Sequence, residues 1–169
     1  MSLPPAAGLR RTSLCLVLAI VMGCSASPPP EEVVRGEAGA PREVNVILRD
    51  YLFLPEPIEL IRGETVRFNL INGGLLAHEF VLGGDEVQTA WADAHAAATP
   101  PGFLATAPPA SVSPDVAGLR VLLASGEQAG VEYQVPTSTD IMLACHLPGH
   151  LEQGMVADVR LVARGAAET

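Results

Sequence analysis

The sequence is short of cysteine, histidine and charge, and it contains no lysine. Its 169 residues include three cysteines and four histidines, charged residues make up 17%, and all ten basic residues are arginines. The formal net charge is −9 and the body of the chain carries no basic cluster, so we do not expect nucleic acid as a partner. With 49% hydrophobic residues, the chain can still form the core of one domain with an appendage.

The N-terminal region has no apolar run long enough to span a bilayer. Arg10 and Arg11 precede an apolar stretch at residues 14–22, far short of the roughly 20 residues that a transmembrane helix needs. This pattern is typical of a secretory signal peptide, which we assign to residues 1–23. Gly23 and Cys24 resemble the lipobox of bacterial lipoproteins, in which the cysteine is acylated and becomes the new N-terminus.

Residues 24–39 carry consecutive prolines and acidic residues, a composition typical of a flexible tether. We therefore predict an exported protein, periplasmic or at the cell surface, held to the membrane by a lipid on Cys24. Secretion without lipidation and an uncleaved membrane anchor are the alternatives. Cys15 leaves with the signal peptide, so Cys145 is the one thiol expected in the exported domain and no intrachain disulfide can form.

The domain at residues 40–165 is predicted to be all-β. Apolar residues alternate with polar ones in several short runs, such as Val44, Val46 and Leu48, which indicates half-buried strands. About seven or eight short antiparallel strands, separated by proline and glycine turns, predict a sandwich or barrel. One insertion at residues 85–118 differs: residues 85–98 have helical spacing, with Val87 and Trp91 on one face, and a proline-rich loop follows.

The chemistry concentrates between two predicted strands, where Cys145, His150 and Met155 offer a thiolate, an imidazole and a thioether. Soft sulfur ligands combined with imidazole select copper, and two histidines, one cysteine and a weak axial methionine describe an electron-transfer copper site. One short loop covers only one side of a metal, so the second histidine should come from elsewhere. His78 is the candidate because its alternation points it into the core. A buried structural cysteine with a core histidine is the alternative reading.

On these residues the region 43–162 resembles the cupredoxins, the plastocyanin- and azurin-like type 1 blue copper proteins. Its Cys-x4-His-x4-Met spacing is similar to that of rusticyanin-like members. The resemblance implies a Greek-key β-sandwich holding one copper ion, with His78, Cys145 and His150 as equatorial ligands and Met155 as the axial ligand. Many members have asparagine after the first histidine, whereas this chain has Glu79.

The two remaining histidines are not expected to bind copper. His146 follows Cys145 and should point to the other side of its strand, as a surface or second-layer residue, and His95 is expected to be a solvated residue of the helix. The paired His-x-His motifs of multicopper oxidases are missing from the sequence, and a nitrite reductase would have histidine where Ala144 stands. We therefore expect no enzymatic activity.

The function predicted from these observations is one-electron transfer between redox partners outside the cytoplasm, cycling Cu(I) and Cu(II). The resemblance places His150 at the surface inside an apolar collar, here Leu147, Pro148, Leu151 and the pair Leu75 and Leu76, where donor and acceptor proteins would dock. The alternative is a copper carrier or copper-homeostasis protein without a redox role. Such carriers tend to use sites rich in methionine and histidine, which are scarce in this chain.

Overall fold

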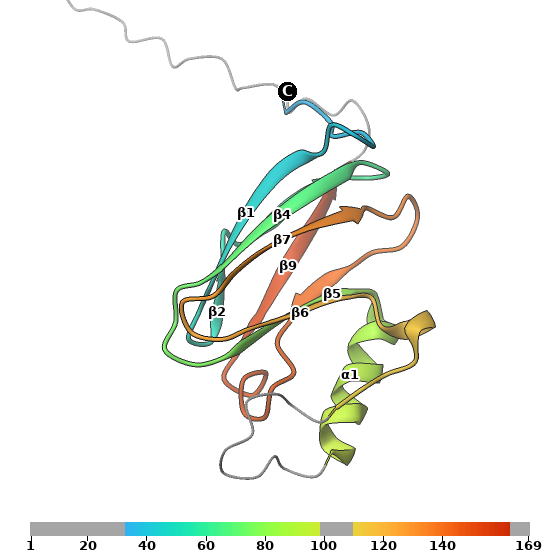
Figure 1. Cartoon of the computed structure of the whole chain (residues 1–169). Helices are drawn as coiled ribbons and strands as arrows, with labels where there is room; N and C mark the ends of the chain where they lie inside the picture. Colours follow the sequence, from blue (N-terminus) through green and yellow to red (C-terminus); the bar gives the residue numbers. More distant parts are fainter. Residues whose placement is uncertain (1–32, 99–109, 163–169) are drawn as a thin grey trace, which may run out of the picture. The chain divides into compact units, whose positions relative to one another are not determined.

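The computed structural model describes residues 33–98 and 110–162, which form a β-sandwich with one α-helix and a single 3-10 turn, η1 (Pro114–Val116) (Figure 1). In this part of the chain nine strands build two sheets, ordered β2-β1-β4-β7 and β3-β9-β8-β5-β6. The strands are β1 (Arg42–Arg49), β2 (Leu52–Leu54), β3 (Ile58–Ile61), β4 (Thr65–Asn72), β5 (His78–Gly83), β6 (Leu119–Leu123), β7 (Gln128–Gln134), β8 (Met142–Ala144) and β9 (Val156–Val162). The expected Greek-key β-sandwich is confirmed. The described part has nine strands where seven or eight were expected, because the alternation did not indicate the short strands β2 and β3.

Strand direction departs from the expectation. Most pairs are antiparallel, but β1 pairs with β4 in parallel and β3 pairs with β9 in parallel. Alternation of apolar and polar residues reports which face of a strand is buried and carries no information on the direction of its neighbour. The expectation of purely antiparallel strands was therefore wrong at these two pairs.

The core lies between the sheets and follows the predicted alternation. In β1, Val44, Val46 and Leu48 are buried and the residues between them are exposed. The strand β4 contributes Val66, Phe68 and Leu70 to the same cluster, with Phe68 packed on Phe80 at a ring-centroid distance of 5.1 Å. This aromatic pair joins β4 of one sheet to β5 of the other and stabilises their packing.

The helix α1 (Asp85–Ala97) covers the outer face of β5, which explains why all six residues of that strand are buried. Trp91 packs against Val81 in a second, smaller hydrophobic cluster, and its Nε1 donates a hydrogen bond to the carbonyl of Ala117 at 2.9 Å. The expected helix at residues 85–98 is thus confirmed. The proline-rich loop lies mostly at residues 99–109, outside the described residues.

The segment before β1 packs on the domain. Gly36 donates its N–H to Glu64 Oε2 at 3.3 Å, and Thr65 donates its N–H to the Gly36 carbonyl at 3.0 Å. The predicted domain begins at residue 40, whereas the contacts with the domain already begin at Gly36. The predicted signal peptide and Cys24 lie outside the described residues. No helix within the described ranges is long and apolar enough to cross a membrane.

Candidate metal centre

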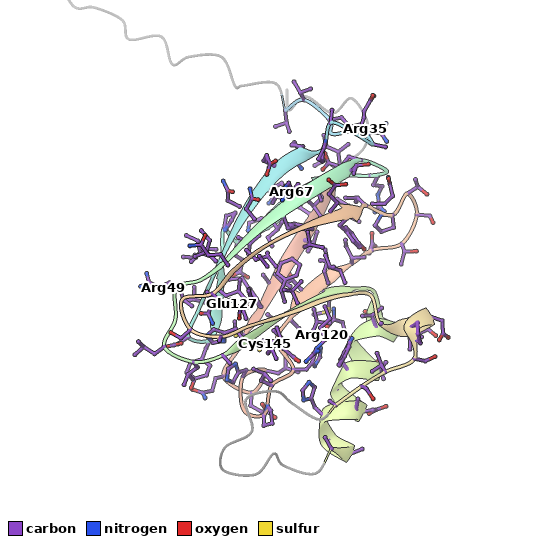
Figure 2. All side chains as sticks on the ribbon, viewed as in Figure 1. Arg35, Arg49, Arg67, Arg120, Glu127 and Cys145 are labelled. Atoms are coloured by element: carbon purple, nitrogen blue, oxygen red, sulfur yellow. The ribbon has the colours of Figure 1, made fainter. Side chains whose placement is uncertain are left out.

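Three of the four predicted ligands meet at one end of the sandwich. His78 is the first residue of β5, Cys145 follows β8, and His150 lies in the loop between β8 and β9. Their donor atoms all lie within 4.8 Å of one another. Figure 2 shows Cys145 at the end of the sandwich opposite Arg35, close to the lower loops.

The distances between these donor atoms fit a transition-metal ion. His78 Nδ1 lies 3.2 Å from His150 Nδ1, and Cys145 Sγ lies 3.3 Å from the same nitrogen. Donors spaced in this way suit metal–ligand bonds of about 2.0–2.3 Å to one shared ion. His78 and Cys145 are fully buried and His150 is 8% exposed, so the centre is closed to bulk water on most sides.

Met155 is fully buried in the same core cluster as Cys145. Its carbonyl accepts the N–H of Cys145 at 3.1 Å, and its N–H donates to the carbonyl of His150 at 3.0 Å. These two bonds close the base of the loop that carries the cysteine and the second histidine. Met155 thus lies in the core next to the loop of the histidine–cysteine cluster, and its role as axial ligand remains a prediction.

The buried environment controls the protonation of the ligands. Burial raises the pKa of the Cys145 thiol to about 11, although the N–H of Glu79 donates to its sulfur at 3.3 Å. A bound cation would shift this balance, because metal binding releases the thiol proton. Burial and the neighbouring His78 lower the pKa of His150, which favours the neutral imidazole that a metal needs.

Two residues that the sequence analysis missed touch the histidine ligands. Asp50 Oδ1 lies 3.1 Å from His78 Nε2, and the ring of Tyr51 meets that of His150 edge-on, with centroids 5.4 Å apart. Tyr51 has a φ of 68°, a left-handed conformation that non-glycine residues rarely adopt. Asp50 and Tyr51 read as an ordinary polar turn after β1, and nothing in the sequence indicated their contact with ligands that follow much later in the chain.

The loop before His78 is organised by Asn72. Its side-chain Nδ2 donates to the carbonyls of Leu76 at 2.8 Å and Leu123 at 3.0 Å, while its Oδ1 accepts the N–H of Gly74 at 2.9 Å. The chain bends at residues 74–76, between β4 and β5. The buried amide also ties this bend to β6, which fixes the loop that leads to His78 on the sheet.

Glu79 turns away from the metal centre and enters a buried polar cluster under α1. One carboxylate oxygen accepts from Arg120 Nε at 2.7 Å, and the other lies 3.1 Å from His95 Nε2. The guanidinium of Arg120 also stacks on Trp91, 4.5 Å from the ring centroid. Only the backbone N–H of Glu79 faces the centre, through its bond to Cys145.

This cluster corrects the prediction for His95. Its side chain is only 7% exposed, since it pairs with Glu79 rather than with solvent. His146 was expected at the surface or in a second layer, and the structure places it in the second layer. It is 7% exposed, and its Nε2 lies 2.7 Å from Gln88 Oε1 on α1. Both histidine side chains lie between α1 and the sheet. They are kept from solvent because α1 packs on the sheet.

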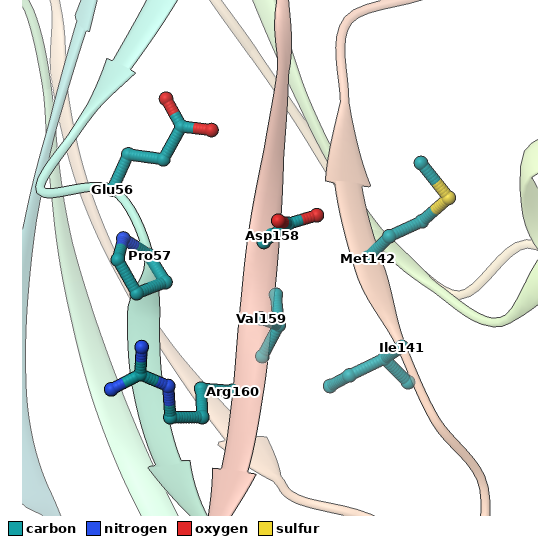
Figure 3. Close-up of a pocket in the computed structure, with 7 residues that line it drawn as sticks. All are labelled: Glu56, Pro57, Ile141, Met142, Asp158, Val159 and Arg160. Carbon is teal, nitrogen blue, oxygen red and sulfur yellow. The ribbon is translucent and has the colours of Figure 1, made fainter.

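Exposed leucines occur in the loop that precedes His78 and in the loop that carries His150. Leu75 is 85% exposed, Leu76 is 42% exposed and Leu151 is 41% exposed. Pro148 is exposed and Leu147 is half-buried. A separate shallow hollow of about 490 Å³ lies at the start of β8 beside β9 and is lined by none of the ligands (Figure 3).

Comparison with known proteins identifies the family. No protein-family model matches the chain. The chain is 39% identical over 123 residues to the copper-resistant cuproprotein CopI of Rubrivivax gelatinosus, covering 72% of this chain and 67% of that protein. It is 30% identical over 169 residues to the protein of the same name from Pseudomonas aeruginosa, covering 85% of this chain and 92% of that protein.

The chain belongs to the CopI family of cuproproteins. Its fold is that of the cupredoxins: auracyanin B superposes with a TM-score of 0.55 at 23% identity, over 72% of this chain and 88% of auracyanin B. The predicted copper cofactor is confirmed by this membership together with the His78, Cys145 and His150 cluster. The structure thus brings together the residues on which the copper prediction depended.

Proposed function

We propose that this copper protein carries single electrons between redox partners outside the cytoplasm and catalyses no reaction of its own. The observation that carries the proposal is the burial of the ligands. His78 and Cys145 are fully buried, and His150 alone of these three keeps a small exposed fraction, 8%. A centre held in this way retains its metal and leaves one ligand through which an electron can reach a partner.

The residues of the chain would hold the ion in nearly one geometry. His78 begins a strand, Cys145 is tied to Glu79 and Met155 through hydrogen bonds, and the loop of His150 is closed at its base. Bound copper supplies the one-electron couple between Cu(II) and Cu(I). Because these ligands are fixed before metal arrives, little reorganisation accompanies the change of oxidation state.

The docking surface in this proposal is the apolar collar of Leu75, Leu76, Leu147, Pro148 and Leu151. Three of its leucines are more than 40% exposed, which is unusual for large apolar side chains gathered in two neighbouring loops. Donor and acceptor proteins would press an apolar surface against this collar and so come close to His150.

A second candidate is copper homeostasis without a redox role. The printed names of the two CopI relatives describe them as copper-resistant cuproproteins, which is compatible with a protein that binds and hands over copper. The two candidate functions differ in which process is fast, electron exchange or copper release. An electron carrier exchanges electrons rapidly and keeps its copper, whereas a carrier of copper releases the ion to an acceptor.

We also infer that the protein works outside the cytoplasm and is anchored to a membrane through Cys24. The supports are the signal-like residues 1–23 and the lipobox-like pair Gly23 and Cys24. Mass spectrometry of the mature N-terminus tests this inference. An unmodified N-terminus downstream of Cys24 would remove the lipid anchor.

The test of electron transfer uses Leu151→Glu. We expect it to leave copper binding and colour unchanged but to slow electron self-exchange about tenfold or more, because a charge in the collar opposes close association. The matched control is Val34→Glu, which adds the same charge at an apolar side chain that is 78% exposed and adjoins Arg35 at the opposite end of the sandwich. Slow self-exchange of the wild type combined with ready copper transfer to a chelator would favour the carrier.

A further inference from the structure

A carboxylate touches the copper ligand His78 on the side away from the other ligands. Asp50 Oδ1 lies 3.1 Å from His78 Nε2, and the same oxygen accepts the backbone N–H groups of Leu75 at 2.9 Å and Leu76 at 3.2 Å. An ionised carboxylate can only accept hydrogen bonds, so His78 Nε2 carries the proton and donates it. The other ring nitrogen, Nδ1, is then free to bind metal, and it is Nδ1 that faces His150 at 3.2 Å.

The contact between Asp50 and His78 is enclosed by backbone. A Cβ on Gly74 would lie 2.8 Å from His78 Nε2 and would collide with Asp50 Oδ1. Gly74 is itself held by Asn72 Oδ1 and, through its carbonyl, by Ser125 Oγ at 2.7 Å. A glycine is therefore required at this point for the carboxylate and the imidazole to meet, and the loop around them has little freedom to separate them.

We propose that Asp50 is a positioning residue that fixes the His78 imidazole for copper and, by its negative charge, favours Cu(II) over Cu(I). Reduction adds one electron and lowers the charge of the ion by one, so a neighbouring anion stabilises the oxidised form more than the reduced form. Loss of a group that hydrogen-bonds to a metal-binding side chain, and so orients it, typically lowers metal affinity by about 10–100-fold. The inference requires copper binding at this site and does not depend on the electron-transfer proposal.

The test is the reduction potential of Asp50→Asn in the copper-loaded protein. Asparagine keeps an oxygen acceptor for His78 and for the two backbone N–H groups but removes the charge. Since Asp50 is 33% exposed, solvent screens part of its field. We expect the ratio of Cu(II) to Cu(I) affinity to fall about tenfold, which raises the potential by about 59 mV for one electron.

The matched control is Glu152→Gln, which removes an exposed carboxylate from the loop of His150. We expect its potential to shift by less than a third of the shift in Asp50→Asn, while both variants keep the intense absorption of the wild type. An unchanged potential in Asp50→Asn, or an equal shift in Glu152→Gln, would overturn the proposal. The result is distinct from the electron-transfer test, because slow self-exchange in the wild type leaves the potential difference measurable.

A second measurement needs no variant and so does not depend on the folding of Asp50→Asn. Nitrogen NMR of the histidine rings in the metal-free wild-type protein reports which nitrogen of His78 carries the proton. We expect the proton on Nε2, facing Asp50. A neutral ring with its proton on Nδ1 would show that Asp50 does not set the tautomer and would overturn the proposal.

Discussion

At the scale of single residues, the copper centre depends most on Cys145. Its side chain is fully buried, its sulfur accepts the N–H of Glu79 at 3.3 Å, and burial raises the pKa of its thiol to about 11. The folded protein therefore holds a protonated thiol until a metal displaces the proton. Copper binding should release protons at neutral pH, in line with a thiol that is not ionised beforehand.

Replacing Cys145 with serine should abolish the intense sulfur-to-copper absorption and weaken copper binding by at least 100-fold, because a hydroxyl is a poor substitute for a soft thiolate. Visible spectroscopy and competition with a chelator measure both effects. The control is Met142→Leu, which removes another sulfur in the neighbouring strand β8 from a half-buried side chain. Retention of the absorption in Cys145→Ser would contradict the assignment of the thiolate ligand.

At the scale of elements, α1 acts as a cover for the sheet behind the copper centre. The helix packs Trp91 on Val81, and Gln88 donates to the carbonyl of Met142 at 3.0 Å while pairing with His146. Beneath it, Glu79 is fully buried between Arg120 and His95. A buried carboxylate is tolerated only with such partners, so the helix and the polar cluster stabilise each other.

Trp91→Ala should lower the free energy of unfolding by about 3–5 kcal/mol, because it leaves a cavity under α1 and removes the ring on which Arg120 stacks. Trp91→Phe keeps an aromatic ring under α1 but is smaller and loses the N–H that donates to Ala117, so its cost should be about 1–2 kcal/mol. Urea unfolding of the metal-free proteins measures both. Equal and small effects of the two substitutions would mean that α1 contributes little to the stability of the sandwich.

At the scale of the whole sandwich, the copper ligands lie at one end and an ion pair with a buried carboxylate lies toward the other. Glu64 is fully buried, and it accepts from Arg42 Nε at 2.9 Å and from the backbone N–H of Ile61 at 2.7 Å. Burial alone would raise the pKa of Glu64, but these hydrogen bonds and the charge of Arg42 outweigh it, and the pKa lies below its ordinary value. The pair joins the start of β1 to the turn between β3 and β4.

The lowered pKa predicts acid sensitivity. A folded-state pKa below the unfolded one means that Glu64 stabilises the protein above about pH 4.5 and that this contribution is lost as the pH falls through the folded-state pKa. Glu64→Gln should reduce stability at pH 7 by about 1–3 kcal/mol and flatten the loss of stability below pH 4.5. Thermal unfolding from pH 7 to pH 3 measures this.

The control for the acid prediction is Glu59→Gln, which breaks a pair with Arg160 in which both side chains are more than half exposed. Exposed pairs contribute about 0–1 kcal/mol, so its pH profile should follow that of the wild type. A profile for Glu64→Gln that is as steep as the wild type would show that other carboxylates govern acid unfolding.

The sequence alone indicated the candidate ligands and the strands next to them. Cys145, His150 and Met155 are close in the chain, and the alternation of Val44, Val46 and similar residues depends only on the two-residue repeat of a strand. Such local signals also identified α1 and placed His78 on an inward face. These patterns can be recognised in the sequence because each depends on the geometry of only a few consecutive residues.

The tertiary structure decided which residues support those ligands. Asp50 and His78 are 28 positions apart and meet only because the turn after β1 and the start of β5 lie at the same end of the sandwich. The burial of His95 and Glu79 likewise required the packing of α1 over β5, and the parallel pairs required the order of strands in each sheet. These contacts join segments distant in sequence, and a pattern read along one segment does not determine which other segment will lie against it.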